Sequence, residues 1–279
     1  MIKEVTDIRE IELFVSDFID DARFSDPMLK TAEQIKINLV DSIANADVKV
    51  WCIYNKYTVL GVFTFLITPD EKYMEMLVGL PRETRAYQEV FCHLCENYAG
   101  FHCDFVFNPQ NYILKRLLTD HNAAFEPEQL KLEYSGQFVP SPVKHTIVPY
   151  SDSYRSGYIA THATDVYWTA EKVLESANGF KTYLAVEKNK VVGYIDVTCC
   201  FEANEIYGLR VPHEYRNKGY ECDLLKRAIE GNANKGMMAY VDVDDVDAVD
   251  LYLSNGFRRK DSENNLTARL VIGKQQPVG

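Results

Sequence analysis

Residues 209–229 read LRVPHEYRNKGYECDLLKRAI, a stretch in which the sequence pattern changes twice. The apolar end of a strand is followed by a short basic turn, and an amphipathic helix then begins. Gly219 lets the backbone approach a ligand closely, while Arg216 and Lys218 add positive charge to the turn. The unpaired N–H groups and the dipole at the start of a helix favour an anion such as a diphosphate. This stretch therefore predicts a strand–loop–helix unit that binds an anionic group.

Residues 245–257, DVDAVDLYLSNGF, form a second motif, one helix and one strand further along the chain. Together the two motifs resemble those of the GNAT superfamily of N-acetyltransferases. In that family the first loop reads Arg/Gln-x-x-Gly-x-Gly/Ala and holds the diphosphate of acetyl-CoA, and the second motif reads Asn-x-x-Ala-x-x-Leu-Tyr-x-x-x-Gly-Phe. The resemblance covers about residues 144–275 well, and residues 1–136 only through the order of their elements.

The resemblance implies that acetyl-CoA is the acyl donor and that no metal takes part. The residues that it assigns to the cofactor site are Leu209, Val211, Arg216, Asn217, Lys218, Gly219, Tyr220, Glu221 and Asp245. The main chain of Leu209 and Val211 is expected to hold the pantetheine arm between two splayed parallel strands, over residues 206–211 and 237–243.

Two of these positions depart from the family pattern. Glu221 stands where a small residue is usual, and Asp245 stands where Asn is usual. A carboxylate in the first turn of a helix suits the helix dipole, yet it would crowd or repel a diphosphate that uses the same N–H groups. These departures predict either an altered cofactor pose or a site that binds no cofactor.

Two residues are candidates for catalysis, Tyr252 by resemblance and Glu205 because the acceptor amine must lose a proton before it attacks. Tyr252 matches the family's general acid, which returns a proton to the departing thiolate, and the alternative is an aromatic side chain that packs on the sheet. Glu205, at the start of the strand that enters the loop, is the first candidate for the base that deprotonates the amine. Its alternative is an exposed residue at a strand end, as glutamates commonly are.

The sequence predicts two α/β halves in which strands and helices follow one another in the same order. We expect a domain over residues 1–136, a linker over 137–145 that contains Pro140-Ser141-Pro142, and a second domain over 146–279. Each domain is predicted to be a mixed, mostly antiparallel twisted sheet flanked by helices, closed by strands over 129–134 and 266–272 respectively. The predicted fold is thus α/β (α+β), with two tandem GNAT-like domains.

A repeated spacing supports this division. Gly61 and Gly193 each open an apolar strand after a turn, and they are separated by as many residues as Phe125 and Phe257. Equal offsets at both ends of a segment indicate an internal duplication, although a chance likeness between two α/β segments would give the same pattern. The first half lacks the phosphate loop, because residues 81–83 read PRE without a glycine. It is therefore interpreted as a degenerate domain that forms one wall of the acceptor pocket.

Composition limits the classes of function. The 279 residues suffice for two domains, 47% of them are hydrophobic, and the net charge of −11 argues against a general nucleic-acid binder. The acidic first thirty residues do not resemble a secretory signal, and no apolar run is long enough for a membrane span. An odd number of cysteines, seven, at irregular spacing is typical of reduced thiols. A cytoplasmic protein without membrane contact is expected.

Two other patterns have simpler interpretations. Cys92 and Cys95, with His102 and Cys103 downstream, superficially suggest zinc, but the pair lies in a predicted helix and small buried thiols explain it better. A group of aromatic residues in the early helices of the second half either lines an acceptor cleft or packs in the core. It consists of Tyr154, Tyr158, Tyr167 and Trp168.

The sequence therefore predicts an N-acyltransferase that moves an acetyl group from acetyl-CoA to a primary amine of a small molecule or peptide. A homodimer is compatible with this prediction. The alternative is a non-catalytic tandem GNAT-fold protein with a binding or regulatory role and an impaired CoA site, since a fold does not fix a function.

Overall fold

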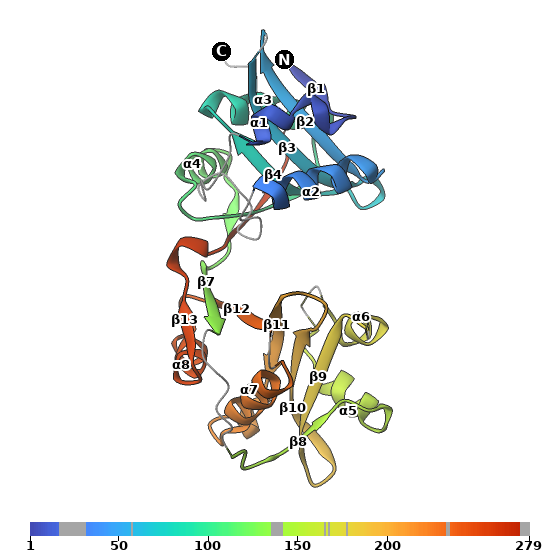
Figure 1. Ribbon diagram of the computed structural model, residues 1–279, viewed down its shortest axis with the longest axis vertical. Coiled ribbons are helices and arrows are strands. Elements are labelled where there is room, and N and C mark those ends of the chain that lie inside the picture. Colours follow the sequence, from blue (N-terminus) through green and yellow to red (C-terminus); the bar gives the residue numbers. More distant parts are fainter. Residues whose placement is uncertain are drawn as a thin grey trace. The chain divides into compact units, whose positions relative to one another are not determined.

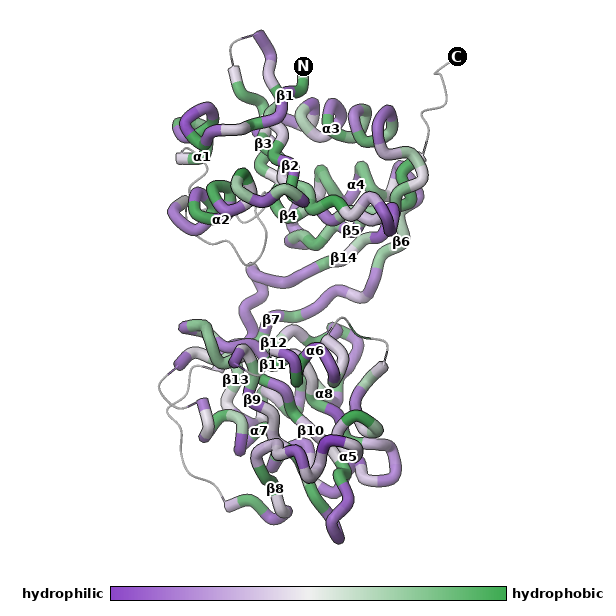
Figure 2. Tube along the Cα trace, turned by 90° about the vertical axis from the view of Figure 1, so that its right-hand side faces the viewer, coloured by the Kyte–Doolittle hydropathy of each residue, from purple (hydrophilic) through white to green (hydrophobic). Residues whose placement is uncertain are grey.

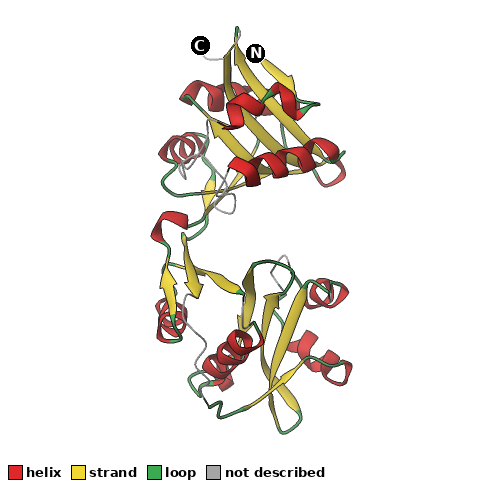
Figure 3. Ribbon diagram, in the orientation of Figure 1, coloured by secondary structure: helices red, strands yellow, loops and turns green. Residues whose placement is uncertain are grey.

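The computed structural model describes residues 1–16, 32–56, 58–134, 142–164, 166, 168–176, 178–232 and 235–273. The chain forms two compact units, one made of Met1–Gln129 with Asp261–Gly279 and the other of Leu130–Lys260. Each unit is a mixed seven-stranded sheet flanked by helices (Figures 1 and 3). Among the described residues, no helix is both long enough and apolar enough to cross a membrane.

The first unit contains the strand order β1-β2-β3-β4-β5-β14-β6. Its strands are β1 (Ile2–Glu4), β2 (Val48–Asn55), β3 (Thr58–Thr68), β4 (Tyr73–Pro81), β5 (His102–Phe107), β6 (Ala124–Phe125) and β14 (Leu266–Val271). Only β4 and β5 are parallel; the other neighbours are antiparallel. A run rich in β-branched and aromatic residues explains the longest strand, β3, since such side chains fill a pleated surface.

Helices cover both faces of this first sheet. They are α1 (Glu12–Ser16), α2 (Ala32–Ala44), α3 (Thr84–Asn97) and α4 (Tyr112–Asp120). Apolar residues of α1 and α2 pack on one face around Val62 and Val78, and those of α3 and α4 pack on the other around Phe63 and Phe105. Figure 2 shows hydrophobic and hydrophilic residues alternating along α2, the pattern of a helix with one face on a core.

The second unit has the strand order β13-β7-β12-β11-β10-β9-β8. Its strands are β7 (Gln129–Tyr134), β8 (Thr146–Pro149), β9 (Phe180–Glu187), β10 (Lys190–Thr198), β11 (Ala203–Arg210), β12 (Gly236–Asp242) and β13 (Phe257–Arg259). Its helices are α5 (Arg155–Thr161), α6 (Ala170–Glu175), α7 (Tyr220–Gly231) and α8 (Val246–Ser254). Helices α5 and α6 cover one face of the sheet, and α7 and α8 cover the other.

The last strands of the two units are exchanged, which corrects the predicted domain boundaries. Strand β14, expected to close the second sheet, pairs with β5 through Leu266↔Phe107. Strand β7, expected to close the first sheet, pairs with β13 through Phe257↔Tyr134. The units therefore divide the chain at Gln129 and Lys260 rather than at a linker over 137–145. Both strands carry the same alternating pattern, and this pattern says which face is buried but not which sheet receives the strand.

The two sheets have the same order of strands once this exchange is taken into account. When the second sheet is read from β8, β10 and β11 are antiparallel, as β3 and β4 are in the first sheet, and β11 and β12 are parallel, as β4 and β5 are. Gly61 and Gly193, the two glycines of the repeated spacing, have equivalent roles. A Cβ at Gly61 would lie 2.8 Å from Ala86 of α3. A Cβ at Gly193 would lie 2.8 Å from Val211 and 3.3 Å from Leu224 of α7. In each unit the glycine lets a helix pack closely on the third strand, as expected of a repeated fold.

Candidate active site

The two parallel strands of the second unit diverge, as predicted. Strands β11 and β12 are paired from Ala203↔Gly236 to Ile206↔Ala239, although β11 continues to Arg210 and β12 to Asp242. On the other side of β11, a β-bulge shifts the register with β10 between the pairs Asp196↔Gly208 and Val197↔Ile206. Beyond Ile206, no further pairing of β11 with β12 is found in the described part of the chain. Such a gap can accept an extended ligand that forms main-chain hydrogen bonds.

The loop after β11 is held by its own cations. Arg216 Nε donates to the Val211 carbonyl at 3.1 Å, and Lys218 Nζ donates to the Glu214 carbonyl at 2.8 Å. The Lys218 ammonium also lies 5.2 Å from the centre of the Tyr215 ring. Both predicted cations therefore stabilise the turn while keeping their positive charge beside it.

The turn ends in a left-handed residue at the start of α7. Gly219 is the N-cap, with φ of +94°, and among the described residues no side-chain hydrogen bond caps the start of the helix. Only glycine adopts this conformation without strain, which explains its place in the motif. Tyr220 is buried, and Glu221 is half-buried in the first turn. The uncapped N–H groups provide donors for an anion, and the Glu221 carboxylate lies in the same turn.

The first turn of α7 also binds the segment that precedes β8. The buried Asp223 carboxylate accepts from the main-chain N–H groups of Lys144 and His145, at 2.8 and 3.0 Å. His145 Nδ1 lies 2.8 Å from the same oxygen, and its ring lies 3.9 Å from that of Tyr220. Sequence reasoning missed His145 and Asp223, because no local pattern links residues so far apart.

The remaining predicted cofactor residues have distinct environments. Val211 is buried in the core under α7, and Leu209 is half-buried and pairs with Ile195 of β10. Asn217 has a positive φ of 60°, which an asparagine tolerates better than most residues. Asp245 is the N-cap of α8 and accepts from the Ala248 N–H at 3.0 Å. Part of the hydrogen-bonding capacity of Asp245 is thus used to start a helix.

Glu205 lies on the α5/α6 face of the sheet. Its neighbour Ile206 packs in the core with α7, and Asn204 donates to Asn232 at the end of α7 at 2.6 Å. Since alternate residues of a strand point to opposite faces, Glu205 points away from α7. Burial raises the pKa of Glu205 to about 7, although the Lys131 charge and a hydrogen bond from Tyr207 act to lower it. A carboxyl with this pKa can exchange protons near neutral pH.

Strand β7 contributes a cation to the same face. Lys131 is 2% exposed and lies between Leu130 and Leu132, which both point into the core on the α7 side. Sequence reasoning missed this residue because β7 was expected in the first sheet.

Beside Glu205, the Tyr207 ring lies 6.1 Å from Trp168 and 5.9 Å from Phe180. Of the aromatic residues considered for the acceptor cleft, Trp168 is in this group, while Tyr167 lies outside the described residues.

Tyr252 lies on the other side of the sheet from Glu205. Its side chain is 5% exposed, belongs to the α7/α8 core and packs against Phe257 with ring centres 5.0 Å apart. Burial raises the pKa of its hydroxyl well above the ordinary value, so the group stays protonated at neutral pH. The two predicted catalytic residues thus point to opposite faces of the sheet that contains the diverging strands.

A buried polar network lies beneath β11. Asp196 is 1% exposed and accepts from the Tyr158 hydroxyl at 2.9 Å, from Thr182 Oγ1, and from His162 Nε2 at 3.1 Å. Burial alone would lower the pKa of His162, but the hydrogen bonds to Asp196 and to the Ala163 carbonyl raise it overall. Tyr158, one of the predicted cleft residues, is therefore fixed inside the core.

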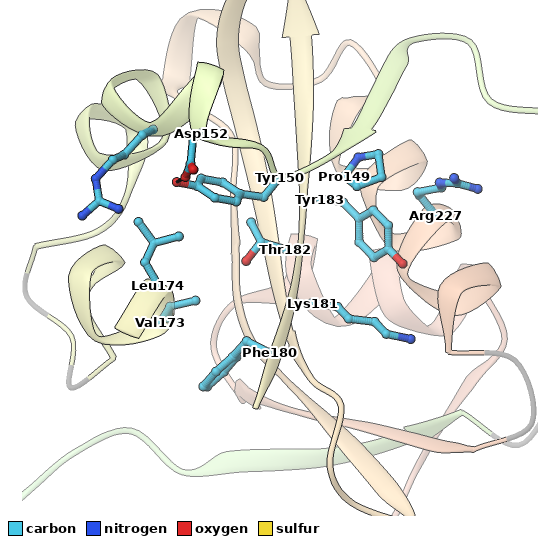
Figure 4. A pocket seen from close by; sticks show the side chains of 11 residues that line it. Pro149, Tyr150, Asp152, Val173, Leu174, Phe180, Lys181, Thr182, Tyr183 and Arg227 are labelled. Atoms are coloured by element: carbon cyan, nitrogen blue, oxygen red, sulfur yellow. Dashed lines mark hydrogen bonds between the residues drawn. The ribbon is translucent and has the colours of Figure 1, made fainter. Parts of the chain in front are cut away.

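A cavity of about 520 Å³ opens at the edge of the sheet where β8 ends (Figure 4). It is lined by Pro149, Tyr150, Asp152, Arg155, Val173, Leu174, Phe180, Lys181, Thr182, Tyr183 and Arg227. Two of its cations already have partners, since Lys181 donates to the Gly231 carbonyl and Arg227 pairs with Glu230. Phe180 belongs both to this cavity and to the aromatic group beside Glu205.

The cysteines form no metal site in the described part of the chain. Cys92 is exposed and Cys95 is half-buried on α3, and no group of three or more potential ligand side chains is placed to hold an ion there.

Comparison with known proteins identifies the fold. Residues 123–267 match the family described as "Acetyltransferase (GNAT) domain". No curated protein matches the sequence. The structure is similar to a tandem GNAT protein from the clavulanic acid biosynthesis pathway, with a TM-score of 0.62, 12% identity, and coverage of 99% of each chain.

Two further solved structures have the same fold. A GCN5-related N-acetyltransferase from Sphaerobacter thermophilus gives a TM-score of 0.64 at 12% identity, over 88% of this chain and 86% of that one. A putative acetyltransferase from Pyrococcus horikoshii gives 0.54 at 18% identity, over 98% of this chain and 91% of that one. At these identities the likeness concerns the fold, and it agrees with the two tandem sheets predicted from the sequence.

Proposed function

Because the chain belongs to the GNAT family of acetyltransferases, we propose that it transfers an acetyl group from acetyl-CoA to a primary amine of a small molecule or peptide. The observation that carries this proposal is a carboxyl group with a pKa of about 7, Glu205, on one of the two diverging strands. A base of this pKa beside a gap suited to an extended thioester arm is what direct transfer to an amine needs.

The residues present fit the cofactor. The first N–H groups of α7 have no side-chain cap, Gly219 leaves room above them, and Arg216 and Lys218 add positive charge. When bound, acetyl-CoA supplies an activated acetyl group on sulfur. In this proposal the loop over residues 216–221 holds the diphosphate, and the main chain of Leu209 and Val211 holds the arm. Asp245 remains a predicted contact of the site.

The chain's own residues would move the protons. Glu205 accepts a proton from the acceptor ammonium, which enters on the α5/α6 face beside Tyr207. A main-chain N–H near Val211 polarises the thioester carbonyl. Tyr252 keeps its proton because it is buried, and it can donate this proton to the departing thiolate from the opposite face. This division places the base and the acid on either side of the gap.

The first unit has diverging strands but lacks the anion-binding turn of the proposed site. The residue before α3 is Glu83, an extended residue with φ of −140°, rather than a left-handed glycine. Its strands β4 and β5 also stop pairing at Met76↔Phe105, so the diverging pair is present without the anion-binding turn. We propose a structural role for this unit.

The direct test is a screen of primary amines with acetyl-CoA and detection of the released thiol. Transfer requires thiol release that depends on the amine and an acetylated product detected by mass spectrometry. If the chain binds acetyl-CoA and no amine gives release, the non-catalytic binding role would replace this proposal. Absence of binding at high micromolar acetyl-CoA would also contradict this proposal and would favour the non-catalytic role with an impaired CoA site.

Replacing Tyr252 with Phe should lower turnover about tenfold while leaving CoA affinity nearly unchanged, because only the proton donor is lost. Leu251→Ala, a change at the adjacent half-buried residue, controls for loosened packing of α8. Initial rates and calorimetric CoA titrations provide the two readouts. Full turnover by the Phe variant would leave Tyr252 with a packing role alone.

Removing the Glu221 charge should tighten CoA binding by roughly three- to tenfold at low salt, because the carboxylate lies in the turn whose N–H groups would bind the diphosphate. Glu221→Gly restores the family's small residue, and Glu221→Gln removes the charge at constant size. Both variants should gain affinity in calorimetry, and the gain should shrink as salt is added. Equal affinities for all three proteins would show that Glu221 does not oppose the cofactor.

A further inference from the structure

His145 lies beside the proposed diphosphate turn, although it comes from the chain before β8. Its Cε1 atom is 3.6 Å from the point where a Cβ on Gly219 would lie. Nδ1 is directed at the Asp223 carboxylate at 2.8 Å, and the ring packs against that of Tyr220 at an angle of 35°. Nε2 is bonded to the same Cε1, so this second nitrogen also lies close to the turn. Within the described residues, no hydrogen bond of Nε2 is found.

The position of His145 is fixed from several directions. Asp223 accepts its main-chain N–H and that of Lys144 as well as its ring, and Tyr220 supports the face of the imidazole. A side chain held by so many contacts has little conformational freedom to lose when a ligand binds. The structure therefore presents a fixed imidazole beside the uncapped start of α7.

We propose that His145 is a further cofactor-binding residue, whose imidazole adds positive charge to the site of the CoA diphosphate when it is protonated. This inference rests on the proposed function. The groups of the turn and of the first turn of α7 include two cations, Arg216 and Lys218, and two carboxylates, Glu221 and Asp223. Protonation of His145 adds one positive charge beside them, which a diphosphate would favour.

Other charged and titratable groups lie near His145. Tyr220 and Asp223 lie on α7, Glu187 at the end of β9 is hydrogen-bonded to Tyr220, and Tyr215 and Lys218 lie on the loop. His213 is a second histidine on this loop, and its side chain is exposed. Glu205 also titrates near neutral pH, but it points to the other face of the sheet. His213 and Glu205 are therefore the groups that the experiment must separate from His145.

The experiment measures the affinity of the full chain for dephospho-CoA between about pH 5.5 and pH 8. This ligand keeps the diphosphate but lacks the 3′-phosphate, a monoester that itself titrates near pH 6. We expect binding to be roughly three- to tenfold tighter at the lower pH, because a partly exposed ion pair contributes on this scale. His145→Gln should abolish this pH dependence, whereas His213→Gln and Glu205→Gln should retain it.

A second measurement uses only the unmodified chain and so does not depend on how a variant folds. Calorimetric titrations near pH 6.5 in two buffers of different ionisation enthalpy should show net proton uptake when dephospho-CoA binds. Binding without proton uptake, or the same pH dependence in His145→Gln, would overturn the inference and leave the proposed function standing. If neither CoA nor dephospho-CoA binds at any pH, the proposed function fails and the role of His145 fails with it.

Discussion

Glu205→Gln lowers turnover of the acceptor amine by about a hundredfold to a thousandfold, because it removes the proposed base. In the unmodified chain, kcat/KM should rise with pH until Glu205 is ionised, near its pKa of about 7. The variant should lose this rise and keep its affinity for CoA. Initial rates of thiol release across the pH range check both expectations. Glu202→Gln, an exposed neighbour outside β11, is the matched control and should keep the pH profile.

Glu205→Gln should raise the stability of the fold at high pH, although it lowers turnover. The pKa of Glu205 is about 7 in the folded chain, against 4.5 without its surroundings, so the folded state binds more protons between these values. Ionisation of Glu205 therefore destabilises the fold as pH rises through this window. Glu205→Gln should melt higher than the unmodified chain at about pH 8, with the difference vanishing below pH 4.5. A variant that is less active and less stable at pH 8 would contradict the role of Glu205 as a buried base.

Asp196→Ala should destabilise the second unit by about 3–5 kcal/mol, because a buried carboxylate that joins three donors is removed. The donors left without an acceptor are Tyr158, Thr182 and His162. Thr182→Val removes only one of these hydrogen bonds at nearly constant volume, and it should cost about 1 kcal/mol. A cost for Asp196→Ala no larger than that for Thr182→Val would contradict the network.

The two tryptophans allow this measurement to be made on one unit. Trp51 lies in the first unit and Trp168 in the second, so a Trp51→Phe background leaves Trp168 as the fluorescent reporter. Urea unfolding of this background with and without Asp196→Ala gives the difference in the free energy of unfolding.

The ion pair between Asp196 and His162 adds a test by pH. Its stabilisation of the fold is complete below pH 6.5 and is lost as pH rises through the raised pKa of His162.

The parts of the site that lie close together in sequence were predictable. The turn before α7 and the N-cap glycine follow from a strand, a basic turn and an amphipathic helix in succession, and each is a local feature. Glu205 could be singled out because it precedes this turn on the same strand. Its raised pKa could not, since it results from burial in the folded chain, which outweighs the opposing charge of Lys131 from a strand far away in the sequence.

The features that depend on distant contacts were not predictable. His145 meets Asp223 across 78 residues, and no periodicity or motif joins them. The exchange of β7 and β14 is invisible to sequence pattern for the same reason, because each strand satisfies either sheet equally well. Lys131 was overlooked as a consequence of this exchange.

The most direct test of the account is a crystal structure of the chain with bound CoA. The account predicts the diphosphate on the main-chain N–H groups after Gly219, and the pantetheine arm between β11 and β12 beyond the last paired residues, Ile206 and Ala239. A structure in which the Glu221 side chain occupies this turn, or in which the ligand lies elsewhere, would contradict acetyl transfer at this site.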